Sequence, residues 1–254
     1  MQFEAPSGYP LGVNKTFRIA SSIVIPLLNL VTKRDWRGAH NLPKSGPVIV
    51  ISNHVSYADA LVFAHFLFGN GRAVRYLGKD SVFKIPILGK ILLAAGQIPV
   101  ARESDRASHA LDSALGLLKA GHCVGIYPEG TLTRDEKLWP MVAKTGIARL
   151  AIISKAPVIP IAQWGDQNLL APYSKRVVFW RRTKITYLAG PALDFSRWYG
   201  KEEDQAALVE ATAYAMAEIR KLLEEIRGEL APHEIFDPHK SKLPRTGNFK
   251  KKKD

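Results

Sequence analysis

A histidine and an aspartate five positions apart follow the first predicted buried strand of the chain, the apolar run at residues 48–51. Inside one regular helix His54 and Asp59 would lie about 140° apart, so His54 must precede the helix and Asp59 must lie in its first turn. With Ser56 as the N-cap, the Asp59 carboxylate can reach back, orient the imidazole and leave its other nitrogen free as a general base. A second interpretation needs no chemistry: Ser56 and Asp59 have the spacing of a capping box, and His54 is then an ordinary loop histidine.

A second polar cluster follows another apolar run, in the segment that begins at Tyr127 and Pro128 and continues with Glu129, Gly130, Thr131 and Arg134. Glycine permits close approach of the backbone, threonine offers a hydroxyl, and the arginine fork suits a phosphate group. The alternative is a strand-to-helix loop with a capping threonine and a solvated arginine. Lys79 and Arg102 each follow a short predicted strand, and each alone would be read as a surface charge.

The elements that must position these residues alternate between strand and helix. Continuous apolar runs predict buried strands, and apolar residues at helical spacing predict the helices between them. Strands are expected at residues 48–51, 73–77, 97–100, 123–127, 158–162 and 184–188, and helices at 57–68, 83–94, 105–119, 146–154 and 202–227. This order predicts an α/β fold with a mainly parallel sheet flanked by helices, in which ligands bind beyond the carboxyl ends of the strands.

The two ends of the chain differ from this pattern. Residues 19–32 carry no charge, and as a helix they would extend roughly 21 Å, too short to cross a hydrocarbon core of about 30 Å. Pro26 and the basic flanks favour an interfacial helix, and a helix packed on the core is the alternative. The expected division is a membrane-associating segment 1–38, a catalytic core 39–200, a packed amphipathic helical segment 201–237 and a disordered basic tail 238–254. No secretory signal is recognisable at the start.

The composition is that of a globular protein, with 46% hydrophobic and 23% charged residues, which excludes fibrous and wholly unfolded classes. One cysteine, Cys123, excludes an internal disulfide framework and fits a reducing compartment. The net charge of +13 attracts polyanions of any kind, so charge alone cannot choose between membranes and nucleic acids. A basic nucleic-acid-binding module is therefore a second hypothesis, to which the mixed segment Trp180-Arg181-Arg182 would contribute.

Four blocks, read in order, resemble the four motifs of the PlsC-like glycerolipid (lysophospholipid) acyltransferase family, and within it the 1-acylglycerol-3-phosphate acyltransferases. The resemblance spans residues 36–190, and the phrase over residues 127–140 looks most like actinobacterial members. The blocks are Asn53-His54 with Asp59, the segment from Lys79 through Pro86, Gly89, Gly96 and Ile98 to Arg102, Pro128-Glu129-Gly130-Thr131, and Pro157-Val158-Ile159-Pro160.

The resemblance implies that His54 deprotonates the hydroxyl of the acceptor and that Asp59 orients His54. It also implies that the acceptor phosphate is bound by Lys79, Arg102, Glu129, Gly130 and Thr131. Arg134 is a less direct match, because Leu132 occupies the position where many members have the arginine. The oxyanion of the reaction needs donors, for which backbone N–H groups near Gly130 or at the helix start after His54 are the candidates.

The expected reaction moves a fatty acyl group from acyl-CoA or acyl carrier protein to 1-acylglycerol 3-phosphate and yields phosphatidic acid. Glycerol 3-phosphate or another lysophospholipid is the alternative acceptor. No metal, no cofactor and no acyl-enzyme is expected, because one base suffices when the thioester is already activated, and Cys123 is interpreted as a core residue. The expected partner is a bilayer with anionic lipids, at the cytoplasmic face of the cell membrane, where the enzyme would be peripheral or monotopic.

Overall fold

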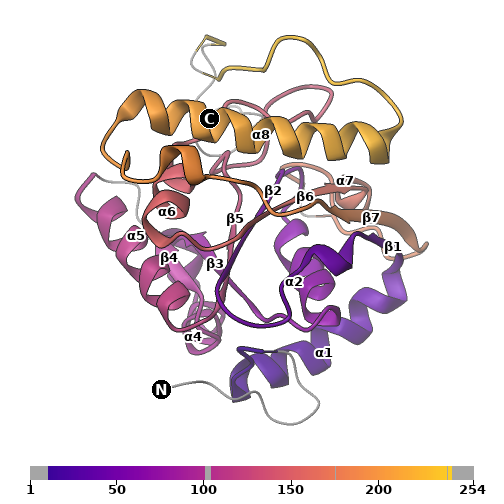
Figure 1. Cartoon of the computed structure of the whole chain (residues 1–254). Helices are drawn as coiled ribbons and strands as arrows, with labels where there is room; N and C mark the ends of the chain where they lie inside the picture. Colours follow the sequence, from indigo (N-terminus) through magenta and orange to yellow (C-terminus); the bar gives the residue numbers. More distant parts are fainter. Residues whose placement is uncertain (1–10, 101–103, 175, 239, 242–254) are drawn as a thin grey trace, which may run out of the picture.

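The computed structural model describes residues 11–100, 104–174, 176–238, 240 and 241. Its centre is one seven-stranded sheet with the strand order β1-β7-β6-β2-β5-β3-β4 (Figure 1). All pairs of neighbouring strands are parallel except β6 and β7, which are antiparallel. The strands are β1 (Thr32–Arg37), β2 (Val48–Ser52), β3 (Val74–Lys79), β4 (Ile98–Val100), β5 (Cys123–Ile126), β6 (Val158–Trp164) and β7 (Thr183–Ala189). The predicted α/β class with a mainly parallel sheet is confirmed.

Helices cover both faces of this sheet. On one face lie α1 (Lys15–Val31) and α2 (Asp59–Gly69), and on the other lie α5 (Ser104–Lys119), α6 (Gly146–Ser154) and α8 (Gln205–Arg227) (Figure 1). The short helices are α3 (Asp80–Phe83), α4 (Leu88–Ala94) and α7 (Asp166–Leu169), and the single turns of 3₁₀-helix are η1 (Ala39–Asn41) and η2 (Ser196–Trp198).

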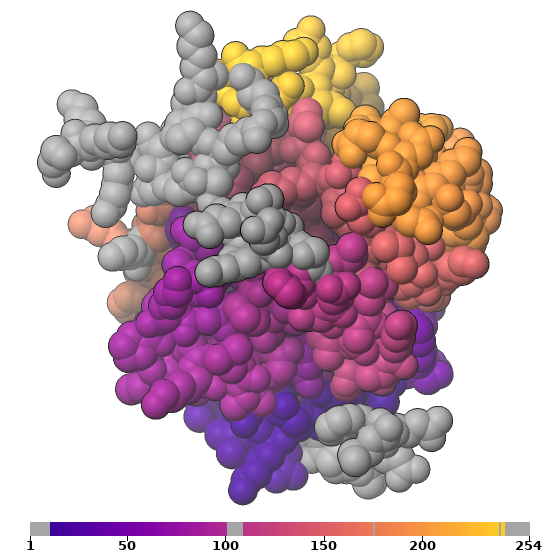
Figure 2. All heavy atoms as spheres, turned by 90° about the vertical axis from the view of Figure 1, so that its left-hand side faces the viewer, coloured from indigo at the N-terminus to yellow at the C-terminus, as the bar shows by residue number. Residues whose placement is uncertain are grey.

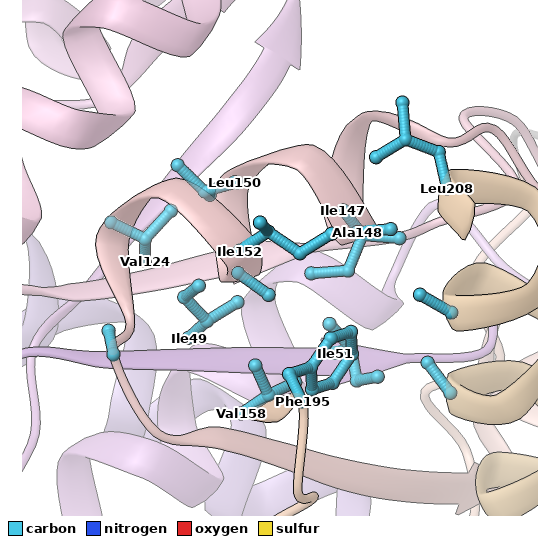
Figure 3. Packing of buried hydrophobic residues seen from close by; sticks show 14 of the residues in the cluster. Ile49, Ile51, Val124, Ile147, Ala148, Leu150, Ile152, Val158, Phe195 and Leu208 are labelled. Carbon is cyan, nitrogen blue, oxygen red and sulfur yellow. The ribbon is translucent and has the colours of Figure 1, made fainter. Parts of the chain in front are cut away.

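The central strand β2 is buried on both faces, which explains its unbroken apolar sequence. Val48 and Val50 belong to the core cluster beneath α1 and α2, whereas Ile49 and Ile51 belong to the cluster beneath α6 and α8. Figure 3 shows Ile49 and Ile51 in that second cluster, close to side chains of α6. Since side chains of a strand alternate between faces, β2 packs into the core on both sides of the sheet. This packing fixes the position of β2, and with it the start of the turn that follows.

Two parts of the chain differ from the sequence expectation. The single helix expected at residues 83–94 is wrong: α3 ends at Phe83 and α4 begins only at Leu88. Pro86 lies between them, and proline disfavours the helical conformation in the residue before it and donates no backbone hydrogen bond. Ile87 has a positive φ of 65°, which also interrupts a helix. The sequence did not predict strand β1, because the strand is rich in charged residues and lacks an apolar run. Such a sequence is compatible with its position at the edge of the sheet.

Helix α1 has two apolar faces. Leu28 is buried against the α2 side of the core, and the ring of Phe17 stacks on Phe68 of α2 with centroids 5.9 Å apart. The opposite face leaves Ile19, Ile23, Leu27 and Leu30 at least half exposed. The two interpretations of this segment thus each describe one face of the helix. Among the described residues, no helix is both long enough and apolar enough to cross a bilayer.

Helix α8 packs along the face that also carries α6. It begins at an Asp204 cap, whose carboxylate accepts the N–H groups of Ala206 and Ala207, and it ends at Gly228 in the left-handed conformation. After Gly228 the chain returns towards the loop after β5, where the Val142 N–H donates to the Phe236 carbonyl at 3.0 Å. Of the expected tail 238–254, only residues 238, 240 and 241 fall within the described residues.

Candidate active site

The turn that follows β2 is bound to the neighbouring strand β6 before it reaches His54. The side chain of Asn53 is fully buried, donates to the Gln163 carbonyl at 3.0 Å and accepts from the Gln163 N–H at 2.9 Å. These two bonds continue the β2–β6 pairing by one residue beyond the strand. Because Asn53 satisfies buried backbone groups that water cannot reach, the chain leaves the sheet in one defined direction.

His54 is held on four sides. Its backbone N–H donates to Glu129 Oε1 at 3.1 Å, and its carbonyl accepts from the Thr133 N–H at 2.7 Å. Its ring lies 4.1 Å from the ring of Tyr127 and nearly parallel to it, at 16°, while Nδ1 lies 2.9 Å from Asp59 Oδ2. The segment after β5 thus holds the segment after β2, as expected for strand ends at the same edge of a parallel sheet.

Asp59 is fully buried and uses one oxygen for three contacts. Its Oδ2 accepts the N–H of Val55 at 2.7 Å and of Ser56 at 3.0 Å, in addition to the contact with His54. Burial raises the pKa of the Asp59 carboxyl, and the three N–H partners oppose that rise. The bond from Ser56 is one half of a capping box, but the Ser56 hydroxyl accepts from Ala58 rather than from Asp59. Helix α2 begins at Asp59 with Ala58 as its N-cap, so Ser56 is not the cap that the sequence suggested.

This arrangement assigns the protons of the imidazole. Asp59 Oδ2 accepts from two backbone N–H groups, so Nδ1 of His54 is the nitrogen that donates to it, and Nε2 carries the lone pair. Among the described residues Nε2 makes no hydrogen bond, and 17% of the His54 side chain remains exposed. An oriented imidazole with a free, accessible Nε2 can remove a proton from a bound hydroxyl group.

Glu129 lies beneath this loop rather than at its surface. It is 3% exposed, and its second oxygen, Oε2, accepts the Met141 N–H at 3.0 Å. Burial raises the pKa of Glu129 to about 8. The motif resemblance implies contact between Glu129 and the acceptor phosphate. In the structure its carboxyl group lies between two backbone segments and accepts the N–H groups of His54 and Met141.

Gly130 and Thr131 lie above Glu129 and are more accessible. Gly130 is exposed and has a φ of 70°, a conformation that side chains rarely adopt. The side chain of Lys144 passes over it: the Lys144 Nζ lies 3.3 Å from the place where a Cβ of Gly130 would stand. Lys144 was not among the predicted site residues. Its signal in the sequence is weak, because it is one basic residue in a loop, and only the fold brings it to Gly130.

The other predicted phosphate-binding residues have different positions. Lys79 is exposed at the end of β3, two strands from β2 in the sheet, and Arg102 lies outside the described residues. Arg134 is 3% exposed and lines a hollow of about 750 Å³ whose lining does not include His54 or Asp59. The hollow is lined by residues 133–138, Pro172, Tyr173, Pro232 and Phe236.

Two of the oxyanion donors considered between His54 and α2 are already in use. The N–H groups of Val55 and Ser56 donate to Asp59, and the N–H of Gly130 donates to the Tyr127 carbonyl at 2.9 Å. In the loop after Gly130, the N–H groups of Thr131 and Leu132 donate no hydrogen bond to any described residue. These two groups are the remaining backbone candidates close to Glu129.

Cys123 is buried within β5, and burial raises its thiol pKa to about 12. A thiol of this kind stays protonated and unreactive at neutral pH. The interpretation of Cys123 as a core residue agrees with this position.

The matching family model carries the description "Acyltransferase" and covers residues 33–164, just over half of the chain. That range contains β2 through β6, all of β1 except Thr32, and every described residue of the site around His54. The chain belongs to the acyltransferase family. The resemblance stated from the four motifs is confirmed, and so is the enzyme class at the level of the family.

Relatives of this acyltransferase include a chloroplastic 1-acyl-sn-glycerol-3-phosphate acyltransferase of Brassica napus, 30% identical over 58% of this chain and 41% of the relative. A 1-acyl-sn-glycerol-3-phosphate acyltransferase of Borreliella burgdorferi is 27% identical over 75% of this chain and 71% of its own. The chain thus spans less than half the length of the first relative and over two thirds of the second.

A solved structure with the same fold is the 1-acyl-sn-glycerophosphate acyltransferase PlsC of Thermotoga maritima. It superposes with a TM-score of 0.63 over 87% of this chain and 86% of its own, at 20% sequence identity. The sheet and its flanking helices are therefore common to both proteins.

Proposed function

We propose that this acyltransferase transfers a fatty acyl group from an acyl thioester to the free hydroxyl of 1-acylglycerol 3-phosphate and forms phosphatidic acid. The observation that carries the proposal is the His54–Asp59 pair, with Nδ1 held at 2.9 Å and Nε2 free at the carboxyl edge of the sheet. The names of the relatives support this acceptor.

The reaction needs one base. His54 Nε2 takes the proton of the acceptor hydroxyl as its oxygen attacks the thioester carbonyl carbon. The tetrahedral intermediate then collapses, the carbon–sulfur bond breaks, and the thiolate receives the proton from the imidazolium. Products are the ester and the free thiol, from acyl-CoA or acyl carrier protein as donor. Asp59 stabilises the imidazolium, and the N–H groups of Thr131 and Leu132 are the donors we assign to the oxyanion.

The acceptor phosphate requires cationic partners near this hydroxyl site. We assign Lys144 to it, because its side chain lies over Gly130, directly beside the carboxyl-terminal edge of β5. Lys79, Arg102, Gly130 and Thr131 remain proposed partners from the motif resemblance, whereas Glu129 acts through the position of His54. Arg134 lines the neighbouring hollow, and it stays a proposed phosphate ligand only if the acceptor extends into it.

Both acceptor and product are lipids, so the protein must meet a membrane. The exposed face of α1 carries Ile19, Ile23, Leu27 and Leu30, with Lys15, Arg18, Lys33 and Arg34 around the helix. Such a helix can lie in the interface of an anionic leaflet, with the catalytic core above it. We place the protein on the cytoplasmic face as a peripheral or monotopic enzyme.

The test is acyl transfer by purified protein, with products identified by mass spectrometry for a panel of acceptors and both donor types. Wild type should produce phosphatidic acid, and His54→Ala should lower kcat by about 10²- to 10⁴-fold with little change in Tm, because the base acts only in the transition state. If product formed only with glycerol 3-phosphate or with another lysophospholipid, that compound would replace 1-acylglycerol 3-phosphate as the acceptor. Undiminished turnover in His54→Ala would contradict the proposed mechanism, and no acyl transfer with any acceptor would contradict the proposed reaction.

A further inference from the structure

The loop between α7 and β7 presents two aromatic side chains to solvent. Phe179 is 73% exposed and Trp180 is 72% exposed, and their rings contact each other edge to face with centroids 5.7 Å apart. Val177 beside them is 45% exposed. The chain buries its other described tryptophans wholly or in part, so this pair is an unusual apolar surface for a polar loop.

The base of this loop is held in place, so the aromatic pair has a defined position. The Val178 N–H donates to the Leu169 carbonyl at 2.8 Å, and Leu170 and Val177 form an antiparallel bridge. The Arg182 guanidinium donates to the Thr32 carbonyl through Nη2 at 2.9 Å and Nε at 3.2 Å. Thr32 is the residue that caps the carboxyl end of α1.

This last contact joins the loop to the exposed stripe of α1. The stripe ends at Leu30, which is 71% exposed and lies two residues before Thr32. The hydrogen bonds between Arg182 and Thr32 therefore connect the segments that carry the two apolar surfaces. In Figure 2 the coral segment before β7 projects from the edge of the molecule, beyond the elements beside it.

The charges around the aromatic pair have mostly one sign. Arg176, Arg181, Arg182 and Lys184 are exposed around it, and the nearby acid Asp35 is paired with Arg37 and Lys184. Aromatic rings that insert below a ring of cations match a surface that is apolar inside and anionic outside. That is the chemistry of a bilayer with anionic headgroups.

We propose that residues 176–182 form a second membrane-contacting element, which inserts Phe179 and Trp180 into an anionic bilayer beside α1. The proposal deepens the proposed function, because it names a contact with the bilayer in which the acceptor would lie. Vesicle binding needs no turnover, so the binding proposal and the proposed reaction can fail independently.

The first test is binding of the full chain to vesicles made of equal parts phosphatidylglycerol and phosphatidylcholine. The double variant Phe179→Ser/Trp180→Ser should bind at least about ten-fold more weakly, since two aromatic side chains no longer leave water. The matched control is Leu230→Ser, which removes an 85% exposed leucine after α8 and should bind as wild type does. Acyl transfer to a dispersed short-chain acceptor should be equal in all three proteins. Equal vesicle binding by the double variant and wild type overturns the proposal.

A second measurement follows Trp180 directly and does not depend on a destabilising change. Vesicles should shift the tryptophan emission of wild type to shorter wavelength, and Trp180→Phe should lose most of that shift while it still binds. A shift of equal size in Trp180→Phe would show that Trp180 stays in water and would falsify the proposal. If the double variant instead lost affinity for a single-stranded oligonucleotide and kept its affinity for vesicles, a nucleic acid would be the occupant and the membrane proposal would be wrong.

Discussion

Asp59 controls His54 through a single oxygen, and this predicts how its substitution behaves. In Asp59→Asn the amide oxygen can still accept the N–H groups of Val55 and Ser56, but the favoured imidazole tautomer and the imidazolium lose their anionic partner. We expect kcat to fall by about 10²- to 10³-fold, less than in His54→Ala, with a small change in Tm. Steady-state kinetics and thermal unfolding of both variants check this order. The reverse order would mean that Asp59 takes part in proton transfer itself.

Lys144 is predicted to bind the acceptor and not the donor. Lys144→Met keeps the aliphatic chain over Gly130 and removes the charge, so the acceptor KM should rise about ten-fold, while the donor KM stays within about two-fold. Lys119→Met is the matched control, because Lys119 ends α5 at the opposite edge of the sheet and should have no effect. A rise in the donor KM alone would assign Lys144 to the phosphates of CoA or to an acidic carrier protein.

Glu129 should make stability depend on pH. Its pKa is raised from an ordinary value of 4.5 to about 8, so between these values the folded protein keeps a proton that the unfolded chain has released. The free energy of unfolding should therefore fall as pH rises through this window, by up to about 5 kcal/mol, and stay level above pH 8. Denaturant unfolding from pH 5 to pH 8 measures this against Glu129→Gln, which cannot titrate. A constant difference between the two proteins would mean that folded Glu129 is ionised throughout.

At the scale of elements, α1 combines a buried face with an exposed apolar face, which we propose contacts the membrane. Removal of residues 1–33 would also delete the buried Leu28 and the start of β1, so substitution separates the two roles better than truncation does. Ile23→Ser/Leu27→Ser changes only side chains that are about 60% exposed.

We expect Ile23→Ser/Leu27→Ser to keep the Tm of wild type and to bind anionic vesicles at least about ten-fold more weakly. Activity should fall more on bilayer substrate than on dispersed short-chain substrate. Val209→Ser on α8 is the control, because it removes an apolar side chain that is 52% exposed on the other face of the sheet. Vesicle sedimentation with each protein decides between α1 and an anchor elsewhere.

At the scale of the whole molecule, the contributions of charge and of apolar surface to vesicle binding should respond differently to salt. The chain has a net charge of +13, of which residues 240–254 contribute seven basic side chains and one acidic one. Raised salt should weaken the attachment of wild type to anionic vesicles without abolishing it, because salt screens charge and leaves apolar insertion in place. A chain without residues 242–254 should show a shallower salt dependence and keep its binding at high salt. Complete release of wild type by salt would leave no role for α1 in attachment.

The sequence alone predicted most of the sheet and the contact between His54 and Asp59. Strands such as β2 and β6 are buried on both faces, so their apolar runs are visible without any structure, and α6 follows its apolar spacing from Gly146 to Ser154. His54 and Asp59 could be predicted as partners because they are only five positions apart, and helical geometry limits how such residues can meet. Pro86 also indicates a helix break, although the apolar spacing over residues 83–94 by itself predicts one continuous helix.

Only the tertiary structure decided the contacts between distant residues. Tyr127 and Glu129 follow β5, yet Tyr127 stacks on the ring of His54 and Glu129 accepts the His54 N–H, although His54 follows β2. The Lys144 side chain lies over Gly130, fourteen positions away in the sequence. Glu129, which the motif resemblance assigned to the substrate, is buried and accepts the N–H groups of His54 and Met141. The edge strand β1 pairs with β7 in spite of its charged sequence. The hydrophobic periodicity of the sequence indicates which side chains are buried. It does not indicate which strand ends become neighbours, because strand order follows from the packing of the whole chain.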